Sequence, residues 1–207
     1  MPWPPRQPDR DTIAADDLQA YDSTVARALS KGTKDAGYYG RLMGSPQLGF
    51  LLSEMGRHVR AAGNSGTSFT HAQREFVDQV LSADFKTNIV QASHINDALS
   101  TGVRMEAIEA LRHAREEELN DDERRLTDFI RRVANGQVDH ASYEAMEAEI
   151  GERGALEYTI FILFLQLTMR LMSAVGMPNP SDEEIDRMIA DMKSGAQTIT
   201  DYRDRIK

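Results

Sequence analysis

The sequence contains no cysteine. Without a thiol the chain can form no disulfide, no thiolate metal ligand and no thiol-based redox centre. A protein that needs no disulfides suits a reducing compartment, so we expect it in the cytoplasm.

A surplus of basic residues is also lacking. The chain carries 33 acidic against 24 basic residues, a formal net charge of −9. An acidic surface repels the phosphates of nucleic acids and of anionic membranes. We therefore expect neither nucleic acid nor a membrane as a partner.

No apolar run is long enough to suggest a membrane span. The most hydrophobic stretch, Tyr158 to Met169, is interrupted by Gln166 and bounded by Glu157 and Arg170. Because a spanning helix needs about 20 apolar residues, the stretch predicts a buried central helix.

The N-terminus lacks the apolar segment of a signal peptide. Residues 1–11 instead hold four of the seven prolines and the only tryptophan, Trp3. They predict an extended arm, with Trp3 either docked on a neighbouring subunit or part of an unstructured tail. Residues 12–207 are of a length suited to one domain.

Strand patterns are absent, whereas apolar residues recur every three or four positions. This spacing predicts an all-α domain of eight to ten helices. Thr70, Asn120 and Ser181 are predicted helix caps, the last opening a helix pair that runs to the C-terminus. We expect helices over 70–84 and 86–101 to form a central antiparallel hairpin packed on a helix over 156–175. Glycine-rich loops are predicted near residues 31–37 and 63–68.

The segment HINDALSTGVRMEAIEALRH, residues 94–113, resembles the central motif of the carboxymuconolactone decarboxylase family. Glu75 matches the family's acidic residue at its usual distance before the histidine, His94. The resemblance covers roughly residues 38 to 176 and includes RLMGSPQLG at 41–49. The same superfamily contains the alkyl hydroperoxide reductase D-type proteins.

This resemblance implies the superfamily's helical fold, an acid–base pair of His94 and Glu75, and a homo-oligomer, most often a trimer or hexamer. It does not imply the peroxidase activity of the second branch. That branch has cysteines four and seven residues before the histidine, where this chain has Val90 and Thr87. Dithiol peroxidase chemistry requires thiolates, so it is excluded.

His94 is the main catalytic candidate because imidazole exchanges protons near neutral pH. It would act as general acid or base, with Glu75 as its orienting partner. The structural alternatives are a histidine at a helix contact bonded to a carbonyl, and a surface carboxylate beside Arg74. No metal is expected, since the five histidines lack ligand spacing, and no cofactor motif is present.

A small organic acid would need a cation to hold it and a cavity around it. Arg170 and Arg41 are the candidate cations, and Arg170 is expected to be partly buried, with Glu157 or Glu75 as its structural partner. A pocket is expected beside Phe85, Val90 and Ile162.

Two functions of different class follow. One is a lyase (decarboxylase) or isomerase acting on a small carboxylated lactone or enol acid. The alternative is a homo-oligomeric helical protein that keeps the scaffold without that chemistry, as the absence of aromatic residues just before His94 suggests.

Overall fold

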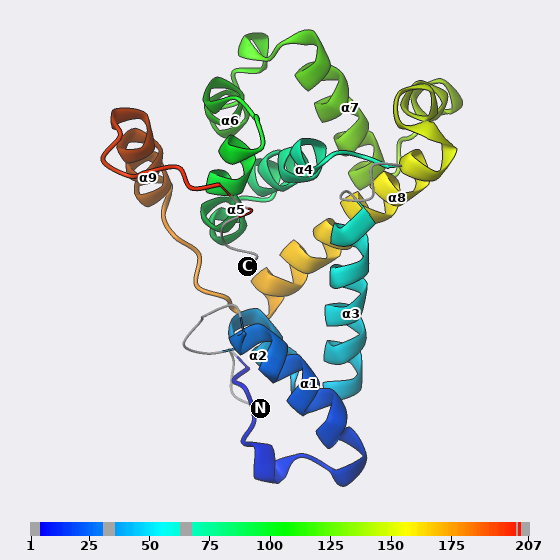
Figure 1. The fold of residues 1–207 in the computed structure, drawn as a ribbon, viewed down its shortest axis with the longest axis vertical. Helices are drawn as coiled ribbons and strands as arrows, with labels where there is room; N and C mark the ends of the chain where they lie inside the picture. Colours follow the sequence, from blue (N-terminus) through cyan, green and yellow to red (C-terminus); the bar gives the residue numbers. More distant parts are fainter. Residues whose placement is uncertain (1–4, 31–35, 63–67, 202, 204–207) are drawn as a thin grey trace. The chain divides into compact units, whose positions relative to one another are not determined.

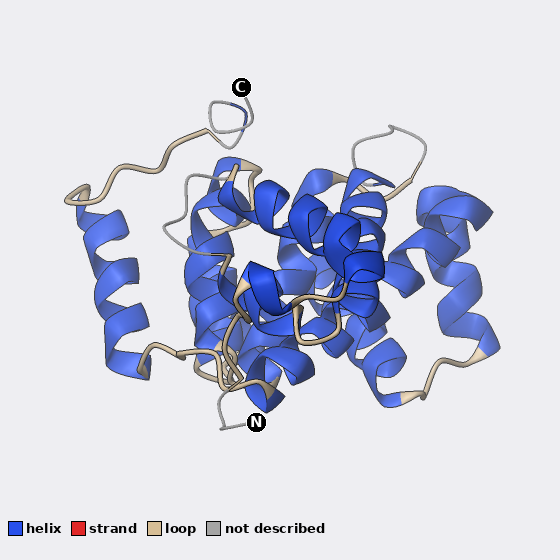
Figure 2. Ribbon diagram, turned by 90° about the horizontal axis from the view of Figure 1, so that it is seen from below, coloured by secondary structure: helices blue, strands red, loops and turns tan. Residues whose placement is uncertain are grey.

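The computed structural model describes residues 5–30, 36–62, 68–201 and 203. The described residues form nine α-helices and no strand, which confirms the predicted all-α class (Figure 2). The helices are α1 (Leu18–Leu29), α2 (Gly37–Leu42), α3 (Pro46–Ala62), α4 (His71–Asp84), α5 (Asn88–Ser100), α6 (Met105–Arg112), α7 (Asp121–Asn135), α8 (His140–Ala174) and α9 (Asp182–Ser194). Short 3-10 helices occupy Arg10–Thr12, Ala15–Asp17 and Glu116–Glu118.

The chain divides into two compact units. One comprises Met1–Val59 with Arg170–Met177, and the other comprises Arg60–Met169 with Pro178–Lys207. The predicted single domain over 12–207 stays a prediction. Trp3 and most of both predicted glycine loops lie outside the described residues.

In the first unit, hydrogen bonds attach the described part of the N-terminal arm to α1 and α2. The Gln7 side-chain amide donates to the Tyr21 hydroxyl at 2.8 Å, and that hydroxyl donates to the Pro8 carbonyl at 2.9 Å. Arg41 donates to the carbonyls of Pro5 and Val175 at 3.1 and 3.0 Å. The arm from Pro5 onward is therefore part of the folded unit.

In the second unit, α4 is the buried helix around which α5, α6 and α7 are packed (Figure 1). Phe69, just before α4, packs against the α8 residues Tyr158 and Phe161, with ring centroids 5.1 and 5.6 Å away. All three side chains are fully buried. Burial of aromatic rings on this scale contributes strongly to stability and fixes where α4 begins.

The three predicted caps are all present, and each forms a complete capping box. The side chain of each cap, Thr70, Asn120 or Ser181, accepts a hydrogen bond from the backbone N–H of the residue three positions later. The side chain of that later residue accepts a hydrogen bond from the backbone N–H of the cap. Such boxes satisfy N–H groups that a helix start otherwise leaves without partners. Gly102 has a φ of 100° just after α5 and ends that helix.

α8 consists of two helical segments, with Gly151 at φ 77°, ψ 162° forming a kink between them. The second segment agrees with the helix predicted over 156–175, but it begins earlier, at residue 152. Only glycine adopts this conformation readily, so Gly151 is the break between the two helical segments. The helix pair predicted to open at Ser181 was wrong, because α9 is the only α-helix among the described C-terminal residues.

α8 is less completely buried than its composition predicted. By length and composition alone α8 is long and apolar enough to cross a membrane, as the core helices of soluble proteins also can be, and 44% of its most apolar segment is buried. Several of its large aliphatic side chains are exposed.

Hydrogen bonds attach the C-terminal segment to α5. The Asn96 side-chain amide donates to the Thr200 carbonyl at 2.8 Å, and its oxygen accepts from the Thr200 N–H at 2.9 Å. Closer to α9, Asn88 donates to the Pro180 carbonyl and to Asp182 at 2.9 and 2.8 Å.

Candidate active site

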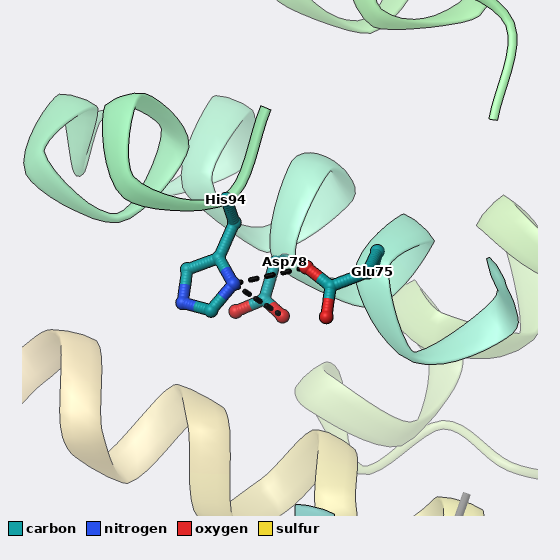
Figure 3. A group of neighbouring side chains, drawn as sticks. All are labelled: Glu75, Asp78 and His94. Carbon is teal, nitrogen blue, oxygen red and sulfur yellow. Dashed lines mark hydrogen bonds and ion pairs between the residues drawn. The ribbon is translucent and has the colours of Figure 1, made fainter. Parts of the chain in front are cut away.

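Consecutive helices bring the candidate acid–base residues together. Glu75 and Asp78 stand three positions apart on α4, which places both on the side facing α5. His94 lies near the middle of α5. The connection between the helices is only three residues long, so residues 19 apart in sequence meet across a helical hairpin (Figure 3).

His94 contacts Glu75 directly, as the sequence predicted. Its Nδ1 lies 2.9 Å from Glu75 Oε2 and 3.7 Å from Asp78 Oδ2. Both carboxylates are fully buried, whereas the His94 side chain keeps 24% of its surface exposed. The alternative of a surface carboxylate at Glu75 is therefore wrong. The partner of His94 is also a carboxylate and not a backbone carbonyl.

The carboxylate contact fixes the tautomer of His94. A carboxylate only accepts, so Nδ1 carries the hydrogen and Nε2 holds the lone pair of the neutral ring. Nε2 points away from both carboxylates (Figure 3). Within the described part of the chain, the hydrogen bonds of His94 all pass through Nδ1. This leaves Nε2 as the atom for proton exchange with a substrate.

The second oxygen of Glu75 is held by neighbours on α4. Oε1 accepts from Arg74 Nε at 3.0 Å and lies 3.1 Å from His71 Nε2. Arg74 also contacts the His71 ring and donates to the Arg60 carbonyl at 3.0 Å. These contacts lock Glu75 in the orientation that faces His94.

Asp78 has an arginine partner of its own. Arg60 donates two hydrogen bonds to Asp78, at 3.2 and 3.0 Å. Its guanidinium also lies over the Phe161 ring, 5.4 Å from the centroid. The E-x-x-D spacing of Glu75 and Asp78 was the available signal for Asp78; no local pattern pointed to Arg60.

The pKa of Glu75 reflects these contacts. Burial alone would raise it, but hydrogen bonds from His71 and His94, with the charges of His94 and Arg74, lower the pKa below its ordinary value. Glu75 therefore stays ionised at neutral pH. An ionised, immobile carboxylate stabilises the imidazolium that forms when His94 takes up a proton.

Glu75, Asp78 and His94 are also a possible set of metal ligands. One ligand atom from each lies within 4.8 Å of the others. However, each carboxylate is already matched by an arginine, Arg74 or Arg60. A divalent cation would have to approach two guanidiniums and replace their hydrogen bonds, so the charge balance favours proton transfer over metal binding.

The other predicted site residues have different surroundings. Val90 is buried in α5, and Phe85 is half-buried at the end of α4. Arg41 bonds to backbone carbonyls, as described above. The expectation that Arg170 is partly buried was wrong, because it lies on the exposed side of α8. Glu75 forms an ion pair with Arg74, and Glu157 forms one with Arg153.

Comparison of the chain with protein-family models, with curated proteins and with solved structures finds no match.

Proposed function

We propose that the protein is a lyase or isomerase that uses His94 as general acid or base on a small carboxylated lactone or enol acid. The observation that carries the proposal is the 2.9 Å contact between His94 Nδ1 and the fully buried Glu75, which leaves Nε2 directed away from the carboxylates. The resemblance of residues 94–113 to the carboxymuconolactone decarboxylase motif supplies the substrate class.

In the decarboxylation, the bond between the carboxylate carbon and its neighbour breaks. Its electron pair passes into a conjugated carbonyl, giving an enolate, and carbon dioxide leaves. Protonated His94 then delivers the proton on Nε2 to carbon and becomes neutral, while Glu75 keeps its bond to Nδ1–H. His94 then takes up a proton from solvent for the next turnover, and the net reaction consumes one proton for each carbon dioxide released.

The charge balance around His94 suits this step. Glu75 and Asp78 are neutralised by Arg74 and Arg60, so the cluster carries no net charge while its histidines are neutral. A neutral cluster does not repel an anionic substrate, although the whole chain is acidic. Binding of the substrate by Arg170 or Arg41 stays a prediction, as does a contact of the substrate with Phe85 or Val90.

The test is turnover of a panel of carboxylated lactones and β-keto or enol acids, followed by carbon dioxide release. We expect His94→Ala to fold, because the side chain is partly exposed, and to lose at least about 100-fold in kcat, the usual contribution of a general acid or base. His140→Ala is the matched control, since its side chain is 88% exposed on α8.

Two results would contradict the proposal. One is wild-type turnover by His94→Ala on a substrate that the wild type consumes. The other is activity that disappears with a chelator and returns with a divalent cation, which would assign the cluster to a metal.

The second candidate function, a helical assembly protein without this chemistry, is supported by the exposed aliphatic side chains of α8. Folded protein that turns over no member of the panel would favour it.

A further inference from the structure

Arg60 brings a positive charge to the edge of the candidate site. It lies in the last turn of α3, and its guanidinium donates to Asp78 Oδ2 at 3.2 Å and to Asp78 Oδ1 at 3.0 Å. The same oxygen, Asp78 Oδ2, lies 3.7 Å from His94 Nδ1. One carboxylate oxygen is therefore in contact with both the cation and the imidazole.

Arg60 is the more accessible of the two arginines in the cluster. Its side chain keeps 28% of its surface exposed, close to the 24% of His94, whereas the Arg74 side chain keeps 11%. Arg74 also donates to Glu75 and to the Arg60 carbonyl. A small molecule from solvent can therefore reach Arg60 and His94 more readily than it can reach Arg74.

The Arg60 guanidinium is held in place on a second side. It lies over the fully buried Phe161 ring of α8, 5.4 Å from the ring centroid. A guanidinium over an aromatic face is attracted to the ring. Donors that are fixed before a reaction stabilise a developing charge most effectively, because nothing has to reorient when the charge forms.

We propose that Arg60 stabilises the enolate oxygen that forms in the reaction of His94, an assignment that rests on the proposed function. The conjugated carbonyl oxygen of the substrate accepts from the Arg60 guanidinium. When the bond to the carboxylate carbon breaks, its electron pair moves into this carbonyl, and the oxygen becomes an enolate beside the cation. His94 Nε2 then delivers its proton to the neighbouring carbon and the carbonyl re-forms. Arg60 stays charged throughout and exchanges no proton.

This role differs from the one predicted for Arg41 and Arg170, which is to hold a carboxylate. A cation on the departing carboxylate would stabilise the starting acid more than the transition state, because charge leaves that group as carbon dioxide forms. A cation at the carbonyl gains strength as the charge arrives. The carbonyl carbon is also bonded to the carbon that His94 protonates, which suits a cation and an imidazole that contact the same carboxylate.

The first experiment compares Arg60→Met with the double variant Arg60→Met/Asp78→Asn on a substrate that the wild type consumes. Removing Arg60 alone also takes a partner from the buried Asp78, so the second substitution restores a neutral pair. If Arg60 acts on the substrate, both variants lose about 100-fold or more in kcat. Arg57→Met is the matched control, an exposed arginine one turn earlier on α3, and should keep the wild-type kcat.

The second experiment measures binding without turnover. The nitronate of β-nitropropionate carries a carboxylate and a charged oxygen pair that resembles an enolate, and calorimetry measures its Kd. Arg60→Met/Asp78→Asn should weaken nitronate binding at least about 10-fold. The nitro form of the same compound lacks the enolate-like charge and should bind equally to the wild type and the double variant. Circular dichroism of every variant checks that the helices remain.

Recovery of the wild-type kcat by the double variant would overturn the assignment, because Arg60 would then serve only to neutralise Asp78. Equal binding of the nitronate by the wild type and the double variant would also overturn it. Turnover that is lost in His94→Ala but kept in both Arg60 variants would contradict this inference and leave the proposed function standing. A wild type that turns over no member of the panel, yet binds the nitronate through Arg60, would support the anion-binding role and contradict the lyase.

Discussion

At the scale of single residues, Glu75 combines full burial with four polar contacts from three side chains. Replacing it with glutamine keeps the shape but removes the negative charge that faces Arg74. Removing one partner of a buried ion pair typically costs about 3–5 kcal/mol. We expect Glu75→Gln to lower the free energy of unfolding by that amount, measured by urea denaturation at neutral pH.

Glu144→Gln is the control for this variant, because Glu144 forms its ion pair with His140 on the exposed surface of α8. Equal stabilities for the two variants would show that the contacts of Glu75 are not a stabilising network.

The pairing of His94 with Glu75 could be predicted from sequence, because helical spacing and a short connection limit where two consecutive helices can touch. The remainder of the cluster could not. Arg60 is 18 residues before Asp78 and on a different helix, and no periodicity specifies which arginine reaches a buried aspartate. The burial of Arg170 was predicted wrongly, because a charged residue in an apolar helix was assumed to face the core, whereas Arg170 lies on the exposed side of α8.

At the scale of helices, Arg112 attaches α9 to α5 and α6. Its buried guanidinium donates to Asp186 at 2.6 Å, to the Asp182 carbonyl at 2.6 Å and to Gln91 at 2.9 Å. The adjacent apolar contact joins Ile185 and Ile189 of α9 to the core. One arginine therefore positions the first turn of a whole helix.

Arg112→Ala should release this turn, since several acceptors lose their donor together. We expect the free energy of unfolding to fall by about 2–4 kcal/mol, with faster proteolysis between residues 178 and 195. Arg187→Ala, an exposed arginine on α9 itself, is the control and should behave as wild type. Unchanged proteolysis of Arg112→Ala would mean that the apolar contact alone holds α9.

At the scale of the whole molecule, acid should destabilise the fold through Glu75. Its pKa is lower in the folded protein than the ordinary value of about 4.3. A lowered pKa contributes stability that is fully present above the unfolded value and is lost as the pH falls toward the folded value. The stability difference between wild type and Glu75→Gln should therefore shrink below about pH 4.

Urea denaturation of both proteins across that range measures the effect. A difference that stays constant down to about pH 3 would show that the ionisation of Glu75 does not contribute to folding.

The fold class could be read from sequence because apolar periodicity is repeated along the whole chain, and each of the three predicted caps marked a helix start. The extent of burial could not. Tyr158 and Leu156 are both apolar in character and two residues apart, yet one is fully buried and the other exposed. Only the packing of α8 against Phe69 and its neighbours distinguishes the two faces.

The contact of Asn96 with Thr200 should make the two positions differ in how well they tolerate substitution. Asn96 holds mainly the N–H and C=O of residue 200, groups that nearly every amino acid supplies. Mutations at position 200 should therefore accumulate freely, apart from proline, which has no N–H. Position 96 has less freedom, because the amide of asparagine supplies its donor and its acceptor on two separate atoms at the distance that the backbone of residue 200 requires.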